Sequence, residues 1–115
     1  MVIKGRYSAS GEYLGKGYSM MNKTSSGWSD PKELDVDGYA SMAKGTYVGA
    51  HWSTDGKHLI LSLSEDKDDD NQDVYVSHLS EDGTWTKPKS VGKTINTDGD
   101  ENGPFLASDG KTLYF

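Results

Sequence analysis

Two segments of the chain each occur twice in similar form, and this repeat constrains the fold more than any other feature. Trp28–Lys32 (Trp-Ser-Asp-Pro-Lys) recurs 57 residues later as Trp85–Lys89 (Trp-Thr-Lys-Pro-Lys). Ser53–Leu59 recurs 54 residues later as Ala107–Leu113. A period of this length is typical of stacked or radial repeats of one supersecondary unit. The sequence therefore predicts a repeat architecture in place of a single ordinary core.

The composition favours strands and turns in each repeat. Only 33% of the residues are hydrophobic and 14 are glycine, which leaves little material for helix packing. Aromatic residues make up 10% of the chain, a level that suits half-buried pleated surfaces. The formal net charge is −6 and the lysines are isolated, so we expect no nucleic-acid partner.

Several classes of structure are not expected from this sequence. It contains no cysteine, so no disulfide framework or thiol chemistry is available. No apolar run approaches the roughly 20 residues that span a bilayer, and we expect no membrane insertion. The opening segment, Met1–Arg6, has no apolar core of the kind found in signal peptides.

Period-two alternation and turn residues divide the second copy into four strands. They are predicted at residues 47–52, 59–63, 74–79 and 85–91. Asp55-Gly56 predicts a tight two-residue hairpin between the first two strands, and Pro88 predicts an edge position for the fourth. Four strands in about fifty residues is the size of one β-propeller blade.

The same marks locate incomplete units on either side. Residues 2–8, 17–21 and 28–34 align with the second, third and fourth strands of a blade, and residues 104–107 and 113–115 align with a first and second strand. The sequence predicts an all-β chain of β-propeller blades of four antiparallel strands, about two blades per chain with interrupted terminal blades. The expected divisions are a partial blade at 1–40, a complete blade at 41–95 and the first hairpin of a further blade at 96–115.

The motifs together resemble the WD-like repeat of TolB-type bacterial β-propellers. They are Ser-x-Asp-Gly-Lys-x-Leu at 53–59, Asp-x-Tyr-x-Ser at 73–77, Trp-x-x-Pro at 85–88 and Gly-x-x-Ile-Asn-Thr-x-x-Asp-Glu-x-x-Pro across 92–104. The resemblance implies a propeller fold and a role in the bacterial periplasm or envelope. The first copy departs from it, because residues 35–39 replace the Ile-Asn-Thr segment.

The repeated residues have a scaffolding interpretation and a binding one. Asp-Gly supplies the positive φ angles of a hairpin turn, and large aromatic side chains supply area for packing between blades. In the binding interpretation, Tyr18, Trp28 and Trp85 are the candidate contacts for a ligand. We favour scaffolding for most of what is repeated.

Two acidic loops are the candidate metal sites. Asp66, Asp68 and Asp70 lie in the carboxylate-rich run 65–73, and Asp98 and Asp100 lie in the second acidic loop, 96–102. Oxygen ligands suit calcium, but the glycine and distal glutamate of an EF-hand loop are missing. The favoured alternatives are a solvated loop for the first run, and side chains bonding turn backbone for the second. No other cofactor is expected.

Catalysis finds little support in the sequence. His51, His58 and His78 fall within predicted strands and do not converge by any motif, and no nucleophile elbow, zinc-protease motif or phosphate loop is present. We therefore expect a non-enzymatic module for binding or assembly, with a protein, peptide or glycan ligand. The alternative is a fragment of a propeller hydrolase or lyase acting on glycans or peptides, with catalytic residues on missing blades or a neighbouring subunit.

The interrupted blades bear on assembly. Closed propellers need roughly four to eight blades, and open sheet edges invite pairing with another chain. We expect several chains to complete one another in a cyclic homo-oligomer, with a trimer of six blades as the first expectation and a tetramer of eight as the next. The competing account is a fragment of a longer propeller.

Overall fold

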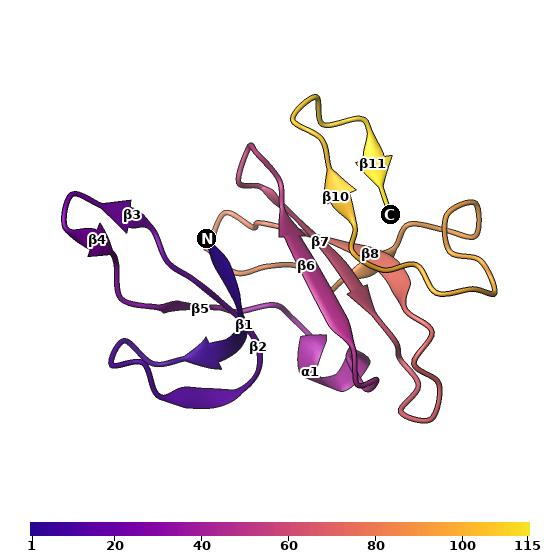
Figure 1. Ribbon diagram of the computed structural model, residues 1–115, viewed down its shortest axis with the longest axis horizontal. Helices are drawn as coiled ribbons and strands as arrows, with labels where there is room; N and C mark the ends of the chain where they lie inside the picture. Colours follow the sequence, from indigo (N-terminus) through magenta and orange to yellow (C-terminus); the bar gives the residue numbers. More distant parts are fainter. The chain divides into compact units, whose positions relative to one another are not determined.

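The computed structural model of the protein describes residues 1–115, and its regular structure is short antiparallel strands with one four-residue helix (Figure 1). The chain divides into two compact units, residues 1–35 and residues 36–115. No helix is both long and apolar enough to cross a membrane. The all-β class and the antiparallel sheets are confirmed, whereas the propeller stays a prediction.

The first unit contains a three-stranded antiparallel sheet. Its strands are β1 (Val2–Tyr7), β2 (Tyr13–Met20) and β5 (Lys32–Leu34), in the order β1-β2-β5. The turn between β1 and β2 is closed by a hydrogen bond from the Gly11 N–H to the Ser8 carbonyl, at 2.9 Å. The three strands predicted before the complete blade are therefore present, with the middle one longer than expected.

A small extra hairpin interrupts this unit between β2 and β5. It pairs β3 (Lys23–Thr24) with β4 (Gly27–Trp28). Trp28 was expected to begin a strand running to residue 34, and this is wrong, because that strand contains only Lys32–Leu34. Pro31 precedes β5 and has no N–H to donate to a neighbouring strand, which accounts for the late start of β5.

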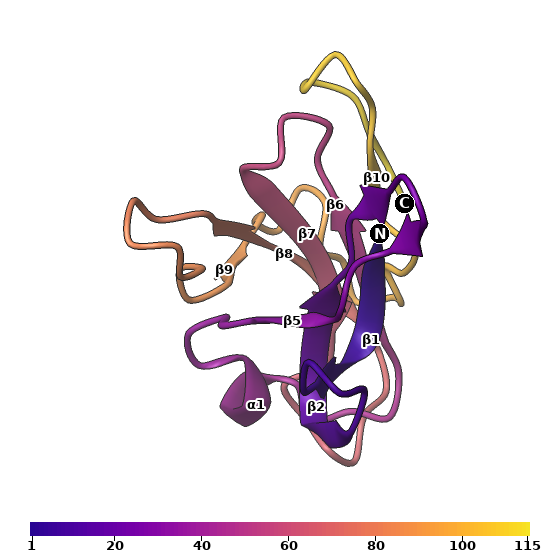
Figure 2. The same cartoon turned by 90° about the vertical axis from the view of Figure 1, so that its left-hand side faces the viewer.

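The second unit contains a four-stranded antiparallel sheet. Its strands are β6 (Val48–Trp52), β7 (His58–Leu63), β8 (Asp73–His78) and β9 (Lys89–Ser90). They lie in chain order, as Figure 2 shows. The predicted four-stranded unit is confirmed. One face of β7 carries Leu59, Leu61 and Leu63, each with no exposed surface, so the core lies on this face.

The fourth strand is much shorter than its predicted range, 85–91. Pro88 removes one ladder donor, and only Lys89 and Ser90 pair with β8. Trp85 instead makes isolated bridges to Val36 and Leu79 and is 2% exposed. Its ring meets the edge of Trp52 at a centroid distance of 5.2 Å. Trp85 is thus a core residue of the second unit.

A short helix, α1 (Tyr39–Met42), precedes β6 and was not predicted. Gly38 stands before it with φ 67°, a left-handed conformation that glycine adopts without strain. Tyr39 and Met42 are buried. The Asp37 N–H donates to the Trp85 carbonyl at 3.0 Å. Residues 36–40, expected in the first partial blade, are therefore bonded to the second unit.

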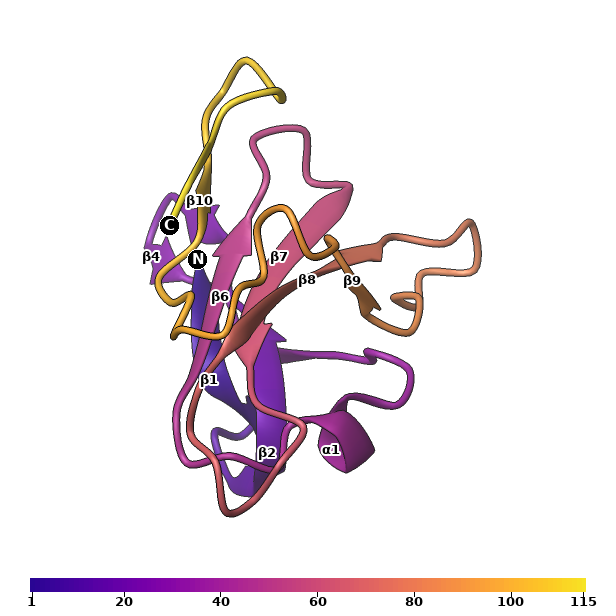
Figure 3. The same cartoon turned by 90° about the vertical axis from the view of Figure 1, so that its right-hand side faces the viewer.

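The last strands, β10 (Phe105–Leu106) and β11 (Leu113–Tyr114), form a separate hairpin in the second unit. Figure 3 shows β10 beside β6. His51 on β6 donates from Nε2 to the Leu106 carbonyl at 3.1 Å, and its ring lies 4.4 Å from that of Phe105. The first strand of the sheet is thus bonded to the first strand of the following hairpin.

Candidate functional site

A groove of about 450 Å³ lies between the four-stranded sheet and the β10–β11 hairpin. Ile60 and Val76 are cross-strand partners and form part of its apolar floor. The other apolar lining residues are Val91, Leu106, Ala107 and Leu113. Its rim carries both copies of the repeated Asp-Gly turn. The repeat therefore brings two matching turns to one concave surface.

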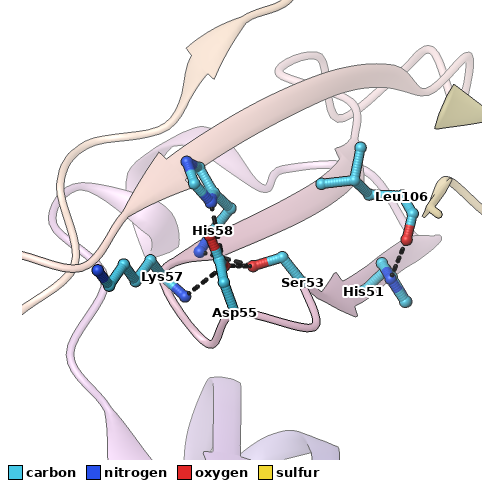
Figure 4. A network of polar contacts seen from close by, with 6 residues as sticks. All are labelled: His51, Ser53, Asp55, Lys57, His58 and Leu106. Atoms are coloured by element: carbon cyan, nitrogen blue, oxygen red, sulfur yellow. Dashed lines mark hydrogen bonds and ion pairs between the residues drawn. The ribbon is translucent and has the colours of Figure 1, made fainter. Parts of the chain in front are cut away.

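The first of these turns spans Ser53–Lys57 and is organised by the Asp55 carboxylate (Figure 4). Asp55 Oδ1 accepts hydrogen bonds from Ser53 Oγ at 2.5 Å and from the Lys57 N–H at 2.9 Å. These bonds, with the Ser53 hydroxyl contributing most, lower the pKa of Asp55 to about 2. Asp55 is therefore an ionised turn cap.

The expectation of a two-residue turn with two positive φ angles is wrong. Five residues join β6 to β7, and Gly56 alone is left-handed, at φ 70°. The side-chain bonds of Asp55 hold the rest of the loop, so the second positive φ is not needed.

The second turn makes the same shape from different side chains. Asp109 Oδ1 accepts from the N–H groups of Lys111 and Thr112, and Oδ2 accepts from Thr112 Oγ1 at 2.7 Å. The Lys111 N–H is the main reason why the pKa of Asp109 is lowered. Ala107 replaces Ser53 and Thr112 replaces His58, yet the turn is kept. The two aspartates stabilise their turns, and their charges lie at the rim of the groove.

Ser53, Asp55 and His58 contain the residue types of a catalytic triad but not its order of contacts. Ser53 Oγ donates to Asp55 and accepts from the backbone N–H of His58 at 2.9 Å. The His58 imidazole meets Asp55, at 3.3 Å, and makes no contact with the serine hydroxyl. A nucleophilic serine needs a base on its own proton. This order of contacts is that of a side-chain-bonded turn and differs from that of a catalytic triad.

The two acidic loops meet at a second, polar depression of about 380 Å³. Asp66 from the first loop and Asp98 from the second line it together with Glu65, Asp69 and Asp73. Burial, followed by the charges of Glu101 and Glu65, raises the pKa of Asp73. No three histidine, cysteine or acidic side chains of the chain are arranged to hold a metal ion. The depression is a concentration of negative charge.

Two of the other predicted metal ligands, Asp70 and Asp100, bond backbone N–H groups through their carboxylates. The Asp68 N–H donates to Asp66 Oδ1, and Asp70 Oδ1 accepts from the Thr46 N–H at 2.7 Å. Asp100 Oδ1 accepts from the Gln72 N–H at 3.0 Å, which lowers its pKa. These bonds favour the two loop interpretations, and calcium binding by Asp66, Asp68 and Asp70 or by Asp98 and Asp100 stays a prediction.

Side chains in the second acidic loop bond backbone, as predicted. Asn96 Oδ1 accepts from the Val74 N–H at 2.8 Å, and Asn96 Nδ2 donates to the Val74 carbonyl at 2.9 Å. Glu101 Oε2 accepts from the Thr97 N–H at 3.0 Å. Glu101 is buried, and its carboxylate closes the loop from inside. This loop is a fixed part of the second unit.

Two of the three predicted binding residues are buried. Tyr18 is 3% exposed on β2, paired with Lys4 and Leu34, and Trp85 is 2% exposed. The prediction that Tyr18 and Trp85 contact a ligand is therefore wrong, because a buried ring cannot meet a ligand directly. Trp28 is 52% exposed in the outer pair of the extra hairpin, opposite Lys23. Only Trp28 presents the aromatic surface expected of it.

The groove residues were not singled out from the sequence, although part of the signal was present. Ile60 and Val76 alternate with the core-facing residues of their strands, which placed them on the opposite face. Leu113 lies in the repeated segment. The pairing of Ile60 with Val76 depends on strand register, and the contact of β10 with β6 depends on tertiary structure.

A comparison with protein-family models gives no match to this chain, and neither curated proteins nor solved structures match it.

Proposed function

We propose that the protein is a non-enzymatic binding and assembly module, built of propeller-type blades and completed by self-association of several chains. The groove carries this proposal. It is concave, has an apolar floor, and bears Asp55 and Asp109 on its rim. A peptide or protein segment with an apolar side chain beside a basic one complements that lining. A glycan, with its apolar ring faces, is the other candidate ligand.

The sheet order supports propeller-type blades. Antiparallel sheets of three, four and two strands follow one another along the chain, apart from the small β3–β4 hairpin. In a propeller, the first strands of successive blades line the central channel. The contact between His51 on β6 and Leu106 on β10 is of this kind.

The β10–β11 hairpin supports self-association. A two-stranded hairpin is marginally stable alone, and β11 pairs only with β10. Phe105, Tyr114 and Phe115 are 51%, 61% and 58% exposed. An unpaired strand edge with exposed aromatic rings is a template for another strand. In the proposed assembly, strands of a second chain extend this hairpin, and a ring of three chains is the first expectation.

Light scattering after size-exclusion chromatography tests the assembly. We expect three or four times the 12.6 kDa mass of one chain. Tyr114→Lys should dissociate the assembly because it places a charge on the β11 edge. Tyr47→Lys is a matched control, since Tyr47 is 62% exposed and lies outside the strands. A folded wild-type protein that stays monomeric at high concentration refutes self-association.

Peptide and glycan arrays test the binding function. Val76→Ser should weaken capture of the selected ligand, because Val76 is part of the groove floor. Val48→Ser is the control, a half-buried valine of the same sheet whose register places it on the opposite face. Equal binding by both variants would remove the groove from the proposal. Turnover of any array compound, abolished by Asp55→Asn or Asp98→Asn, would favour the hydrolase or lyase alternative.

A further inference from the structure

Two histidines face each other across the second and third strands of the four-stranded sheet. His58 on β7 is the register partner of His78 on β8. The Leu79 N–H donates to the Lys57 carbonyl at 2.9 Å, so His58 and His78 form a non-hydrogen-bonded pair. Side chains are closest at such pairs. The ring centroids lie 4.9 Å apart at an interplanar angle of 74°. Strand pairing therefore brings together two histidines that no sequence motif connects.

Asp55 determines which nitrogen of His58 is free. Its Oδ1 lies 3.3 Å from His58 Nδ1, and an ionised carboxylate only accepts hydrogen bonds (Figure 4). Nδ1 therefore carries the hydrogen, and Nε2 of the neutral ring keeps its lone pair. A carboxylate behind the non-ligating nitrogen is the arrangement that orients metal-binding histidines in proteins.

Both rings are accessible. The His58 side chain is 36% exposed, and His78 lies at the surface. Metal–imidazole bonds are about 2.0–2.1 Å long, so two ligating nitrogens must come within roughly 4 Å of each other. The ring torsion of histidine is soft. Because the two residues are directly opposed and the ring centroids are 4.9 Å apart, rotation of the side chains is the movement that the site requires.

We propose that His58 and His78 form a two-imidazole site for a divalent transition metal such as Zn²⁺ or Cu²⁺, with Asp55 as the positioning residue. Imidazole ligands select these ions over Ca²⁺ and Mg²⁺. Two protein ligands leave the other coordination positions open to water or an added ligand. His58 also lines the groove, so the open positions lie at its rim. All three residues belong to the second unit, and the site does not depend on the proposed assembly.

Calorimetric titration of the full, tag-free chain with Zn²⁺ tests the site. We expect saturable binding of one ion per chain. His58→Gln and His78→Gln should each weaken it at least tenfold, because each removes one of two ligands. His51→Gln is the matched control, a strand histidine whose Nε2 is already bonded to Leu106. It should bind Zn²⁺ as the wild type does. Circular dichroism establishes that the variants are folded.

Electron paramagnetic resonance of the Cu²⁺-loaded wild type is independent of any variant. We expect hyperfine coupling to two imidazole nitrogens. Coupling to none or one, or a complete lack of binding, overturns the proposal. Unchanged Zn²⁺ affinity in both glutamine variants also overturns it. In that case, loss of binding in Asp69→Asn/Asp98→Asn would assign the ion to the acidic depression.

Discussion

The side chain of Asn96 takes the place of a strand residue, and its removal gives the sharpest test of the fold. The ladder between β8 and β9 contains only the pairs Tyr75–Ser90 and Val76–Lys89. At Val74 the Asn96 side-chain amide bonds both the N–H and the carbonyl, and its Nδ2 also donates to Ser90 Oγ at 2.9 Å. Asn96 thus extends the edge of the sheet with a side chain.

The expected cost of Asn96→Ala follows from these bonds. Three hydrogen bonds are lost, at about 1 kcal/mol net each, and an unsatisfied buried N–H costs about 1–3 kcal/mol. Val74 is fully buried, so water cannot replace its lost partner readily. We expect the free energy of unfolding to fall by roughly 2–4 kcal/mol, since these two estimates overlap in part.

Urea unfolding followed by tryptophan fluorescence measures this loss. In a Trp28→Phe background, the remaining tryptophans, Trp52 and Trp85, both belong to the second unit and report its unfolding. With a urea slope of about 1–3 kcal/mol per M, the midpoint should fall by roughly 0.7–4 M.

The control for this prediction is Asn102→Ala. Asn102 makes a single exposed side-chain bond, to Asp100, and its loss should change stability by less than about 0.5 kcal/mol. An Asn96→Ala protein within 0.5 kcal/mol of the wild type would refute the strand-like role. Asn96→Asp keeps the acceptor for the Val74 N–H but loses the donor to the Val74 carbonyl. Its free energy of unfolding should lie between those of the alanine variant and the wild type, or below that of the alanine variant if the Val74 carbonyl repels the new charge.

Three further predictions concern the second unit. Trp85→Ala should lower its stability by about 3–5 kcal/mol in thermal or urea unfolding, because the ring is almost completely buried; a loss below 1 kcal/mol would contradict its place in the core. Gly56→Ala should lower the free energy of unfolding more than Gly83→Ala. Both glycines have positive φ, but only a Cβ at Gly56 would come within 3.2 Å of another side-chain atom, Trp52 Nε1. Equal urea midpoints for the two variants would contradict this prediction. The folded-state pKa of Asp55, about 2, lies below its ordinary 3.8, so the stabilising effect of the ionised carboxylate is complete above pH 4 and is lost as the pH falls toward 2. In acid titrations, Asp55→Asn should therefore lose less stability over that range than the wild type. An unchanged pH profile would show that the Asp55 carboxylate does not stabilise the fold.

The sequence predicts the strands well where periodicity and turn residues agree. The apolar run of β7 and the alternation of β6 and β8 place these strands within a residue or two of their observed bounds. The fourth strands are the exception. Pro88 predicts an edge position, yet both Pro31 and Pro88 also shorten their strands by removing an N–H.

The candidate site was less predictable because its chemistry depends on pairing. The sequence places His58 and His78 in strands, but only the register of β7 with β8 sets them opposite each other. For Trp85 the sequence suggested a role that the structure does not support. As a repeated aromatic residue it was a candidate ligand contact, but tertiary packing buries it among core residues.

The carboxylate-capped turns have a consequence for how such a repeat changes over time. Asp55 and Asp109 hold the same turn with different neighbours, and Asp82 does so again through Thr84. The aspartate and the glycine are consecutive in all three turns, and a unit that keeps these two residues can retain its hairpin while the neighbouring residues differ. The shape of a turn and the chemistry of the groove rim beside it can therefore change independently, as the exchange of Ser53 for Ala107 and of His58 for Thr112 illustrates.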